Sequence, residues 1–87
     1  MGYKVQFAAS AERQFGKLDK PVQRRIDSLV ERIESLADPR TIGEALHGDT
    51  LGEYWKYRAG DWRLRASIHD RLVLIEVVEI LHRSKAY

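Results

Sequence analysis

Residues 53–65 read EYWKYRAGDWRLR and predict two β-strands joined by a tight glycine turn. Aromatic and basic side chains alternate before the turn, and the same chemistry resumes after it. Because a strand turns every second residue to the same face, Lys56 and Arg58 should share one face of the first strand. Arg63 and Arg65 should share one face of the second. Four cations set among aromatic rings suit a phosphate chain whose bases can stack, so the stretch favours an RNA-handling surface.

The rest of the chain predicts two helices before this hairpin and one strand on either side. Tyr3, Val5 and Phe7 alternate with polar residues and predict a strand over about 3–7. Ser10 is the expected N-cap of a short helix that reaches about residue 18. A second helix should begin near 19–21.

The second helix has the clearest pattern in the sequence. Its apolar residues recur at helical spacing and give it one apolar side. They are Val22, Ile26, Leu29, Val30, Ile33 and Leu36. Asp38 and Pro39 should stop it, because the residue before a proline avoids helical geometry. Residues 40–52 hold three glycines and no sustained period, which predicts a loop.

The C-terminal half predicts three strands, over about 53–58, 62–69 and 72–81. Residues 69–71 should form a tight hairpin between the last two strands. The last strand begins apolar on both faces, which is typical of a strand inside a sheet. The expected fold is α+β in the order β-α-α-β-β-β: two N-terminal helices on a small, mostly antiparallel, four-stranded sheet, with residues 1–87 as one domain.

Composition excludes several classes of function. With 87 residues, 44% of them hydrophobic, the chain can bury one small core. It has no cysteine and three scattered histidines, so disulfides, thiol chemistry and a metal centre are not expected. No apolar run is long enough to span a bilayer, and the start lacks the apolar segment of a signal peptide. We therefore expect a cytoplasmic protein without cofactor or membrane association.

The positive charge is concentrated in the C-terminal part. Residues 1–50 hold eight Lys or Arg and eight Asp or Glu, whereas residues 51–87 hold seven against five. The whole net charge of +2 therefore comes from the second part. A solvated sheet face is the ordinary alternative to a binding surface.

Three stretches resemble the RelE/ParE superfamily of bacterial toxins, most closely the RelE-type ribosome-dependent mRNA interferases. They are KLDKPVQRRI at 17–26, GEYWKYRAGDWRLR at 52–65 and the terminal HRSKAY at 82–87. The resemblance covers nearly the whole chain. It implies a metal-free endoribonuclease that cuts mRNA in the ribosomal A site, where the ribose 2′-hydroxyl attacks the adjacent phosphate. It also implies an antitoxin, the ribosome and mRNA as partners.

The resemblance assigns catalytic roles to five residues. Lys56 and Arg58 match the family's basic pair on the second strand, and Arg63 matches the arginine that opens the third. Arg83 and Tyr87 match the terminal arginine and tyrosine. Arginine suits the charge that develops on phosphorus, because its guanidinium fork pairs with two phosphate oxygens. The residues leave open which group takes the 2′-hydroxyl proton and which protonates the leaving oxygen.

Three further residues are candidates for RNA binding. Arg65 can contact RNA or pair with Glu76 or Glu79 across strands. Trp62 can stack on a base or pack at the rim of the core. His82 suits acid or base work, because histidine titrates near neutral pH, but it alternates with its neighbour and can face the other side of the strand.

Neighbouring side chains have plainer roles. Trp55 and Tyr57 point away from the basic pair and should pack under the helices. The arginines at 24, 25 and 32 should lie on the polar side of the second helix, where they are solvated or contact ribosomal RNA.

Two alternatives to the nuclease stay open. One is a ParE-like toxin that binds DNA gyrase and has no nuclease site. The other is a member of the superfamily that only binds RNA or an antitoxin. For the nuclease we expect Arg63 and Arg83 on the concave face of the sheet, sharing one phosphate. Counting back from a tight turn at 69–72 sets Arg63 opposite residue 78, which leaves Arg83 too far along its strand unless a bulge shifts the register.

Overall fold

The computed structural model describes residues 2–46 and 54–85. Its elements are β1 (Lys4–Phe7), α1 (Ala9–Gly16), α2 (Lys20–Ser35), β2 (Glu44–Ala45), β3 (Tyr54–Ala59), β4 (Trp62–His69) and β5 (Leu74–His82). Short 3-10 turns cover Pro39–Thr41, Asp70–Leu72 and Arg83–Lys85. No described helix is long and apolar enough to cross a membrane.

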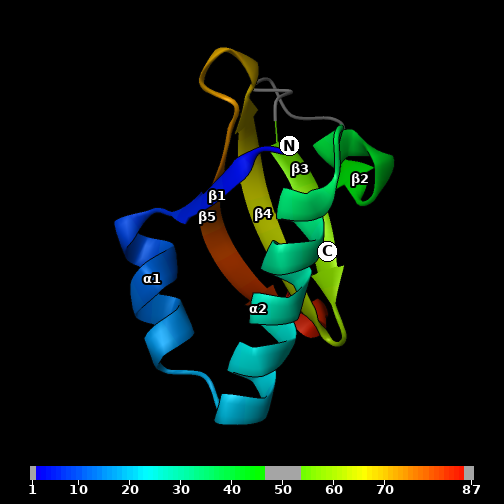
Figure 1. Ribbon diagram of the computed structural model, residues 1–87. Helices are drawn as coiled ribbons and strands as arrows, with labels where there is room; N and C mark the ends of the chain where they lie inside the picture. Colours follow the sequence, from blue (N-terminus) through cyan, green and yellow to red (C-terminus); the bar gives the residue numbers. More distant parts are fainter. Residues whose placement is uncertain (1, 47–53, 86–87) are drawn as a thin grey trace.

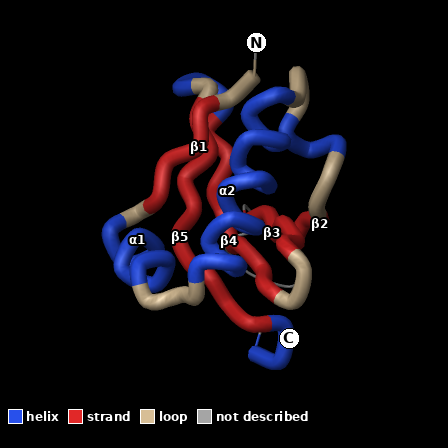
Figure 2. Tube along the Cα trace, turned by 60° about the horizontal axis from the view of Figure 1, so that its bottom comes forward, coloured by secondary structure: helices blue, strands red, loops and turns tan. Residues whose placement is uncertain are grey.

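The strands form one sheet in the order β1-β5-β4-β3-β2. β1 runs parallel to β5, and the other neighbouring pairs are antiparallel. Both helices lie on the same side of the sheet, with α2 crossing in front of β4 and α1 beside β5 (Figures 1 and 2). The α+β class and the helical pair are confirmed, and β5 is an interior strand as its apolar start predicted.

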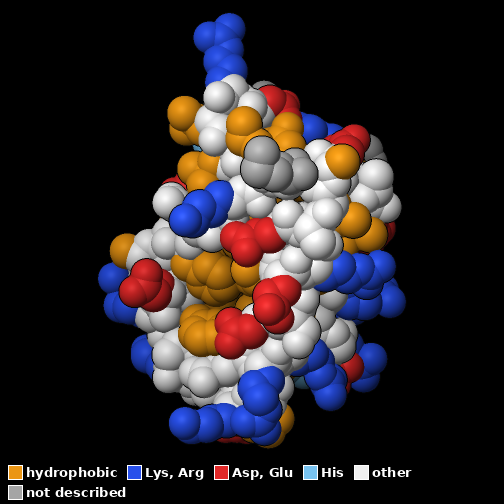
Figure 3. Space-filling view, in the orientation of Figure 1, with side chains coloured by type: hydrophobic (Ala, Val, Ile, Leu, Met, Phe, Trp, Pro, Cys, Tyr) orange, Lys and Arg blue, Asp and Glu red, His pale blue; other side chains and the backbone are white. Residues whose placement is uncertain are grey.

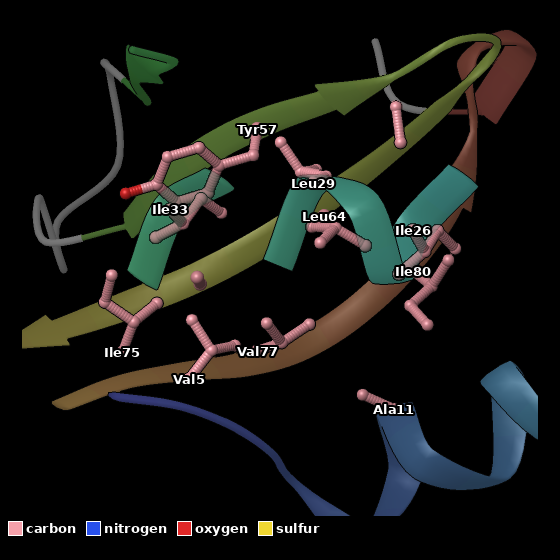
Figure 4. Packing of buried hydrophobic residues seen from close by; sticks show 12 residues of the cluster. Val5, Ala11, Ile26, Leu29, Ile33, Tyr57, Leu64, Ile75, Val77 and Ile80 are labelled. Atoms are coloured by element: carbon pink, nitrogen blue, oxygen red, sulfur yellow. The ribbon is translucent and has the colours of Figure 1, made fainter. Parts of the chain in front are cut away.

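The core lies between α2 and the sheet. Figure 4 shows Tyr57 and Leu64, from β3 and β4, pointing toward Leu29 and Ile33 of α2. Of these, Tyr57, Leu64 and Ile33 are fully buried. The apolar side of α2 therefore packs as its spacing predicted. Tyr57 does lie under the helix, and its hydroxyl donates a 2.7 Å hydrogen bond to the carbonyl oxygen of Pro39.

Three predictions about element boundaries in the N-terminal half were wrong. The sheet has a fifth strand, β2, within the predicted 40–52 loop, and its two residues pair with Trp55 and Lys56. Helix α2 ends at Ser35, before the predicted stop, because the next residue, Leu36, is already extended. α1 begins at Ala9.

Ser10 is therefore inside α1 instead of capping it. The N-cap is Ala8, whose backbone N–H donates to the carbonyl oxygen of Val77 in β5. The end of β1 thus fixes where the helix can begin. The Ser10 hydroxyl donates to the carbonyl oxygen of Val78, also in β5.

The β4–β5 connection is longer than the predicted tight hairpin. A 3-10 turn occupies Asp70–Leu72, and Val73 follows in the left-handed region with φ of 50°. His69 consequently pairs with Leu74. A bulge between Arg65 and Ala66 then shifts the register by one more residue.

Candidate phosphate-binding site

The predicted basic residues of the hairpin lie on one face of the sheet. In the β3–β4 register Lys56 pairs with Arg65, and Arg58 pairs with Arg63. Directly paired residues project to the same face. Tyr57, between the two cations of β3, points into the core, so alternation directs these four side chains away from the helices.

Arg63 is buried and held by backbone. Only 7% of the residue is exposed. Its Nη1 donates to the carbonyl oxygens of Gly60 and Trp62, at 2.8 and 3.0 Å. Its Nε is buried and has no hydrogen-bond partner among residues 2–46 and 54–85. The guanidinium is thus fixed at the β3–β4 turn with part of its donor capacity unused.

The other cations of this face differ in their partners. Lys56 is nearly covered, with 11% of its side chain exposed, and its Nζ lies 3.7 Å from a carboxylate oxygen of Glu44 in β2. Arg65 forms a 3.0 Å ion pair with Glu79, and its guanidinium carbon lies 4.9 Å from the centre of the Tyr54 ring. Arg58 is exposed and makes no hydrogen bond or ion pair with any described residue.

The register brings Arg83 to the same turn as Arg63. Arg63 pairs with Leu81, where counting from a tight hairpin had given residue 78. The longer connection contributes two residues of this shift and the bulge contributes one. The backbone N–H of Arg83 donates to the carbonyl oxygen of Asp61, at 2.7 Å. Its Nε lies 3.7 Å from the Asp61 carboxylate, and both side chains are more than half exposed.

A hollow of about 300 Å³ lies beside β3, between residues of α2 and residues of the sheet. It adjoins the part of β3 that β2 leaves unpaired, since β2 pairs only with Trp55 and Lys56. Its lining combines apolar and cationic side chains. The lining residues are Leu29, Arg32, Ile42, Gly43, Glu44, Lys56, Tyr57, Arg58 and Arg63. In the space-filling view, Lys and Arg side chains gather along the margin of the molecule on this side (Figure 3).

Burial raises the pKa of Tyr57, one of the lining residues, to about 12. At neutral pH the Tyr57 hydroxyl therefore stays protonated and donates to Pro39. This hydrogen bond positions the segment that leads into β2. A second contact ties the same segment to the far end of the sheet, because Arg40 pairs with both carboxylate oxygens of Asp70, at 3.0 and 2.9 Å.

Comparison with known proteins agrees with this architecture. Residues 5–87 match the family described as the ParE toxin of the type II toxin–antitoxin system parDE. The chain belongs to this toxin family. No protein of curated function matches its sequence.

Solved structures of RelE proteins share the fold of this toxin. A chain of the RelBE2 toxin–antitoxin complex of Mycobacterium tuberculosis superposes with a TM-score of 0.83 at 23% identity, over 95% of this chain and 100% of its own. The RelE–RelB complex of Pyrococcus horikoshii gives 0.77 at 23%, over 99% and 100%. An E. coli RelE mutant bound to a RelB peptide gives 0.68 at 28%, over 92% and 82%. The resemblance to the RelE/ParE superfamily is therefore confirmed.

The structure of the toxin brings most of the predicted site residues together. Lys56, Arg58, Arg63 and Arg65 share a face by register, and Arg83 meets the β3–β4 turn beside Arg63. Tyr87 lies outside the described residues. The catalytic roles of these residues, and a phosphate shared by Arg63 and Arg83, stay predictions.

Trp62 and His82 form a pair of their own. They are opposite each other in the β4–β5 register, and their rings meet edge to face with centres 5.2 Å apart. Trp62 packs against the core, and the Nδ1 of His82 lies 3.0 Å from the Ser84 hydroxyl oxygen. Alternation along β4 turns Trp62 away from the face of its neighbour Arg63. This favours the structural alternative for Trp62.

Three charged residues lie near the site: Arg25 and Arg32, which were expected only to be solvated or to contact ribosomal RNA, and Glu44, which carried no prediction. Arg32 lines the hollow, and Glu44 reaches Lys56. Arg25 packs over the β3–β4 turn, since a Cβ added to Gly60 would collide with its guanidinium. Arg25 and Arg32 flank Leu29 at positions i, i+4 and i+7. This spacing on one side of the helix is the signal that could have identified them.

Proposed function

We propose that this type II toxin is a ribosome-dependent endoribonuclease that cleaves mRNA in the A site and inhibits translation. The proposal rests on one observation. The β3–β4 register sets four cations, two from each strand, on one face of the sheet, and Arg83 contacts the turn that joins these strands. Phosphate binding needs such a cluster, and the likeness to RelE structures supports this reading.

In the proposed reaction the ribose 2′-oxygen attacks the adjacent phosphorus. The 2′-hydroxyl gives up its proton, the bond from phosphorus to the 5′-oxygen breaks, and the leaving oxygen is protonated. The products are a 2′,3′-cyclic phosphate and a 5′-hydroxyl. Arg63 and Arg83 hold the phosphate and stabilise the charge that develops on it. Lys56, Arg58 and Tyr87 bind the backbone or move protons.

Two contacts refine these roles. The Nζ of Lys56 lies 3.7 Å from a carboxylate oxygen of Glu44, and this contact positions the ammonium group on β3, where it can bind a phosphate oxygen. The two carbonyl contacts of Arg63 fix its guanidinium before substrate arrives, which is the preorganisation that electrostatic catalysis requires. The ribosome supplies the in-line alignment of the RNA.

A gyrase-binding toxin is the second candidate. The family that the chain matches is named for ParE, and three of the cations have carboxylate partners within the protein. A surface neutralised in this way suits protein contact as well as RNA contact. The exposed Arg58, and the Nε of Arg63 that no described residue pairs with, favour the nuclease.

We propose that an antitoxin encoded beside this toxin binds across the helical pair and the sheet edge and inhibits the toxin by covering or displacing the basic surface. Several RelE structures of this fold hold a RelB antitoxin. The helical side of this chain has partly buried apolar residues, including Phe15, Leu18 and Val22, on which an extended or helical segment could pack. Acidic residues of the partner would complement Lys56 and Arg58.

The deciding experiment compares purified wild type and Arg83→Ala on translating ribosomes, with mRNA ends mapped by primer extension. The proposal expects codon-specific cuts by the wild type and a loss of roughly 30-fold or more in the variant. A parallel gyrase supercoiling assay covers the alternative. Inhibition of gyrase with intact mRNA would replace the nuclease by the ParE-like activity.

We also propose that the chemical step needs no divalent metal, because cations of the protein neutralise the phosphate. A metal-swap series on intact ribosomes, which need magnesium themselves, tests this. Cleavage of a phosphorothioate mRNA that is restored only by a thiophilic metal would refute it.

A further inference from the structure

The end of β5 holds a histidine that lies away from the basic face. His82 is the last residue of β5, and the 3-10 turn Arg83–Lys85 follows it directly. Its side chain is half-buried, and its ring meets the Trp62 ring edge to face, with centres 5.2 Å apart. Trp62 and His82 are paired across β4 and β5, so both project to the side of the sheet opposite to that of Arg63. His82 is therefore not placed to touch a phosphate on the basic face.

The Nδ1 atom of His82 accepts a hydrogen bond from the turn that follows. The backbone N–H of Ser84 donates to Nδ1 at 3.3 Å, and the Ser84 hydroxyl oxygen lies 3.0 Å from the same nitrogen. A backbone N–H can only donate, so Nδ1 presents its lone pair and the proton of the neutral ring is on Nε2. His82 thus acts as the N-cap of the turn, because an N-cap side chain accepts from the backbone N–H two or three residues later.

Two hydrogen bonds hold the backbone on either side of Arg83. The N–H of Arg83 donates to the carbonyl oxygen of Asp61 in the β3–β4 turn, at 2.7 Å. The N–H of the next residue, Ser84, donates to His82. The first bond joins backbone to backbone, whereas the second depends on the side chain at position 82. The Arg83 side chain is 63% exposed, so its direction depends on how well these two bonds hold its backbone.

We propose that His82 is a positioning residue of the toxin: its unprotonated Nδ1 holds the Arg83–Lys85 turn and thereby directs Arg83 toward the phosphate at the β3–β4 turn. The inference rests on the proposed nuclease, in which Arg83 binds the phosphate that is cut. It gives His82 no contact with RNA and no part in proton transfer. Trp62 assists, because the packing of its ring restricts the rotation of the imidazole.

The contacts separate this role from two others that a histidine can have beside a working arginine. A general acid or base needs a ring nitrogen within reach of the reacting oxygen, whereas Nδ1 is engaged by Ser84 and the ring lies with Trp62 on the other side of the sheet. A residue that only packs needs the ring and not the nitrogen. In His82 both the ring and the nitrogen are in use, and substitutions can separate them.

Two substitutions at position 82 provide a matched comparison. His82→Phe keeps an aromatic ring against Trp62 and removes the acceptor. His82→Asn removes the ring and keeps an acceptor at the same number of bonds from the backbone, and asparagine is among the best N-cap residues. On translating ribosomes, His82→Phe should lower the rate of mRNA cleavage roughly three- to tenfold, the effect of one hydrogen bond, and His82→Asn should stay within about twofold of the wild type.

The other roles give different results. Loss of a general acid or base would impair both variants alike, and loss of packing would make His82→Asn the worse of the two; either outcome overturns the proposal. His69→Phe is the control for the loss of a histidine, because His69 is exposed at the opposite end of β4, and it should stay within about twofold of the wild type.

A double substitution tests whether His82 acts through Arg83. In the Arg83→Ala background, His82→Phe should change the residual cleavage rate by less than about twofold, because the side chain that the turn directs is already absent. A further loss as large as that in the wild-type background would assign His82 a role of its own in the reaction and overturn the proposal.

Two NMR measurements on the full chain test the positioning without any cleavage. A long-range ¹H–¹⁵N spectrum of the imidazole, recorded at about pH 8 where an ordinary histidine is neutral, should show the proton of His82 on Nε2. The backbone heteronuclear NOE of Arg83 and Ser84 should be lower in His82→Phe than in the wild type and in His82→Asn, because a turn without its cap is less ordered.

These measurements also separate this inference from the proposed function. A proton on Nδ1, or equal order at Arg83 in all three proteins, would overturn the inference and leave the proposed nuclease standing. The expected differences in order together with intact mRNA would support the holding of Arg83 by His82 and refute the nuclease.

Discussion

Replacement of Arg63 by alanine should reduce both the stability and the activity of the toxin, whereas replacement of Arg83 should reduce activity alone. The two arginines meet the same turn but differ in burial. Arg63 is 7% exposed, whereas the side chain of Arg83 is 63% exposed. Removal of an exposed charge has little effect on stability, whereas removal of a buried side chain has a measurable cost.

The cost in stability follows from three contributions at Arg63. Its Nη1 makes two hydrogen bonds to carbonyls, which together we count as one charge-assisted bond of roughly 1.5–3 kcal/mol. The two methylenes that alanine lacks, Cγ and Cδ, are buried, at about 0.8 kcal/mol each. The variant also lacks the buried Nε that no described residue pairs with, and removal of this unfavourable group offsets about 1–3 kcal/mol of the loss. The net loss for Arg63→Ala is about 2 kcal/mol.

Urea unfolding measures this loss directly. A domain of this size has a slope near 1–1.5 kcal/mol per molar urea, so the midpoint should fall by about 1–2 M. The melting temperature should fall by roughly 10 °C. Arg83→Ala is the control and should stay within about 0.5 kcal/mol of the wild type, because its ion pair with Asp61 is exposed.

The activity assay uses folded protein at a temperature well below both transitions. Each variant should lose about 2–4 kcal/mol of transition-state stabilisation, or roughly 30- to 1,000-fold in the rate of mRNA cleavage. An Arg63→Ala protein that unfolds at the wild-type midpoint would refute the burial argument. A folded double variant that cleaves at the wild-type rate would refute the catalytic assignment.

Three further predictions concern stability. Tyr57→Phe should lower the free energy of unfolding by about 1 kcal/mol, because it removes the hydrogen bond to Pro39. Since burial raises the Tyr57 pKa to about 12, the wild type should lose stability as pH rises from about 10 to about 12. Unfolding measured against pH should therefore show a flatter alkaline limb in the variant than in the wild type. The hydrogen bonds from Arg40 hold the pKa of Asp70 below its usual value. The Asp70 carboxylate therefore stabilises the fold at pH values above the ordinary aspartate pKa, and this stabilisation is lost as pH falls through the lowered pKa. Asp70→Asn should flatten the acid limb of the same titration, and an unchanged limb would exclude the contact with Arg40 as a source of stability. Gly60→Ala should cost about 1 kcal/mol or more of stability, because φ is 61° and the added methyl group meets Arg25 of α2. Gly16→Ala, where the added methyl group meets nothing, should be neutral or stabilising by up to about 1 kcal/mol. Thermal melts of the two variants check this, and equal melting temperatures would contradict it.

Local periodicity determined much of the fold. The spacing from Val22 to Leu36 predicted α2 and its buried side, and the alternation in 53–65 predicted which residues of β3 and β4 share a face. Tyr57 and Trp55 do turn toward the helical side, where each donates to a backbone carbonyl. These features follow from the sequence alone because side-chain direction repeats with the local backbone, whatever the rest of the chain does.

Tertiary structure alone decided the register, and with it the site. The left-handed residue Val73 and the bulge at Arg65 move Arg63 from residue 78 to Leu81 and bring Arg83 to the β3–β4 turn. Neither feature has a signature in the sequence, because valine disfavours positive φ and a bulge depends on what the neighbouring strand pairs with. The burial of Arg63, the strand β2 and the hollow against α2 likewise depend on segments distant in sequence, and contacts of that kind are set by packing of the whole chain.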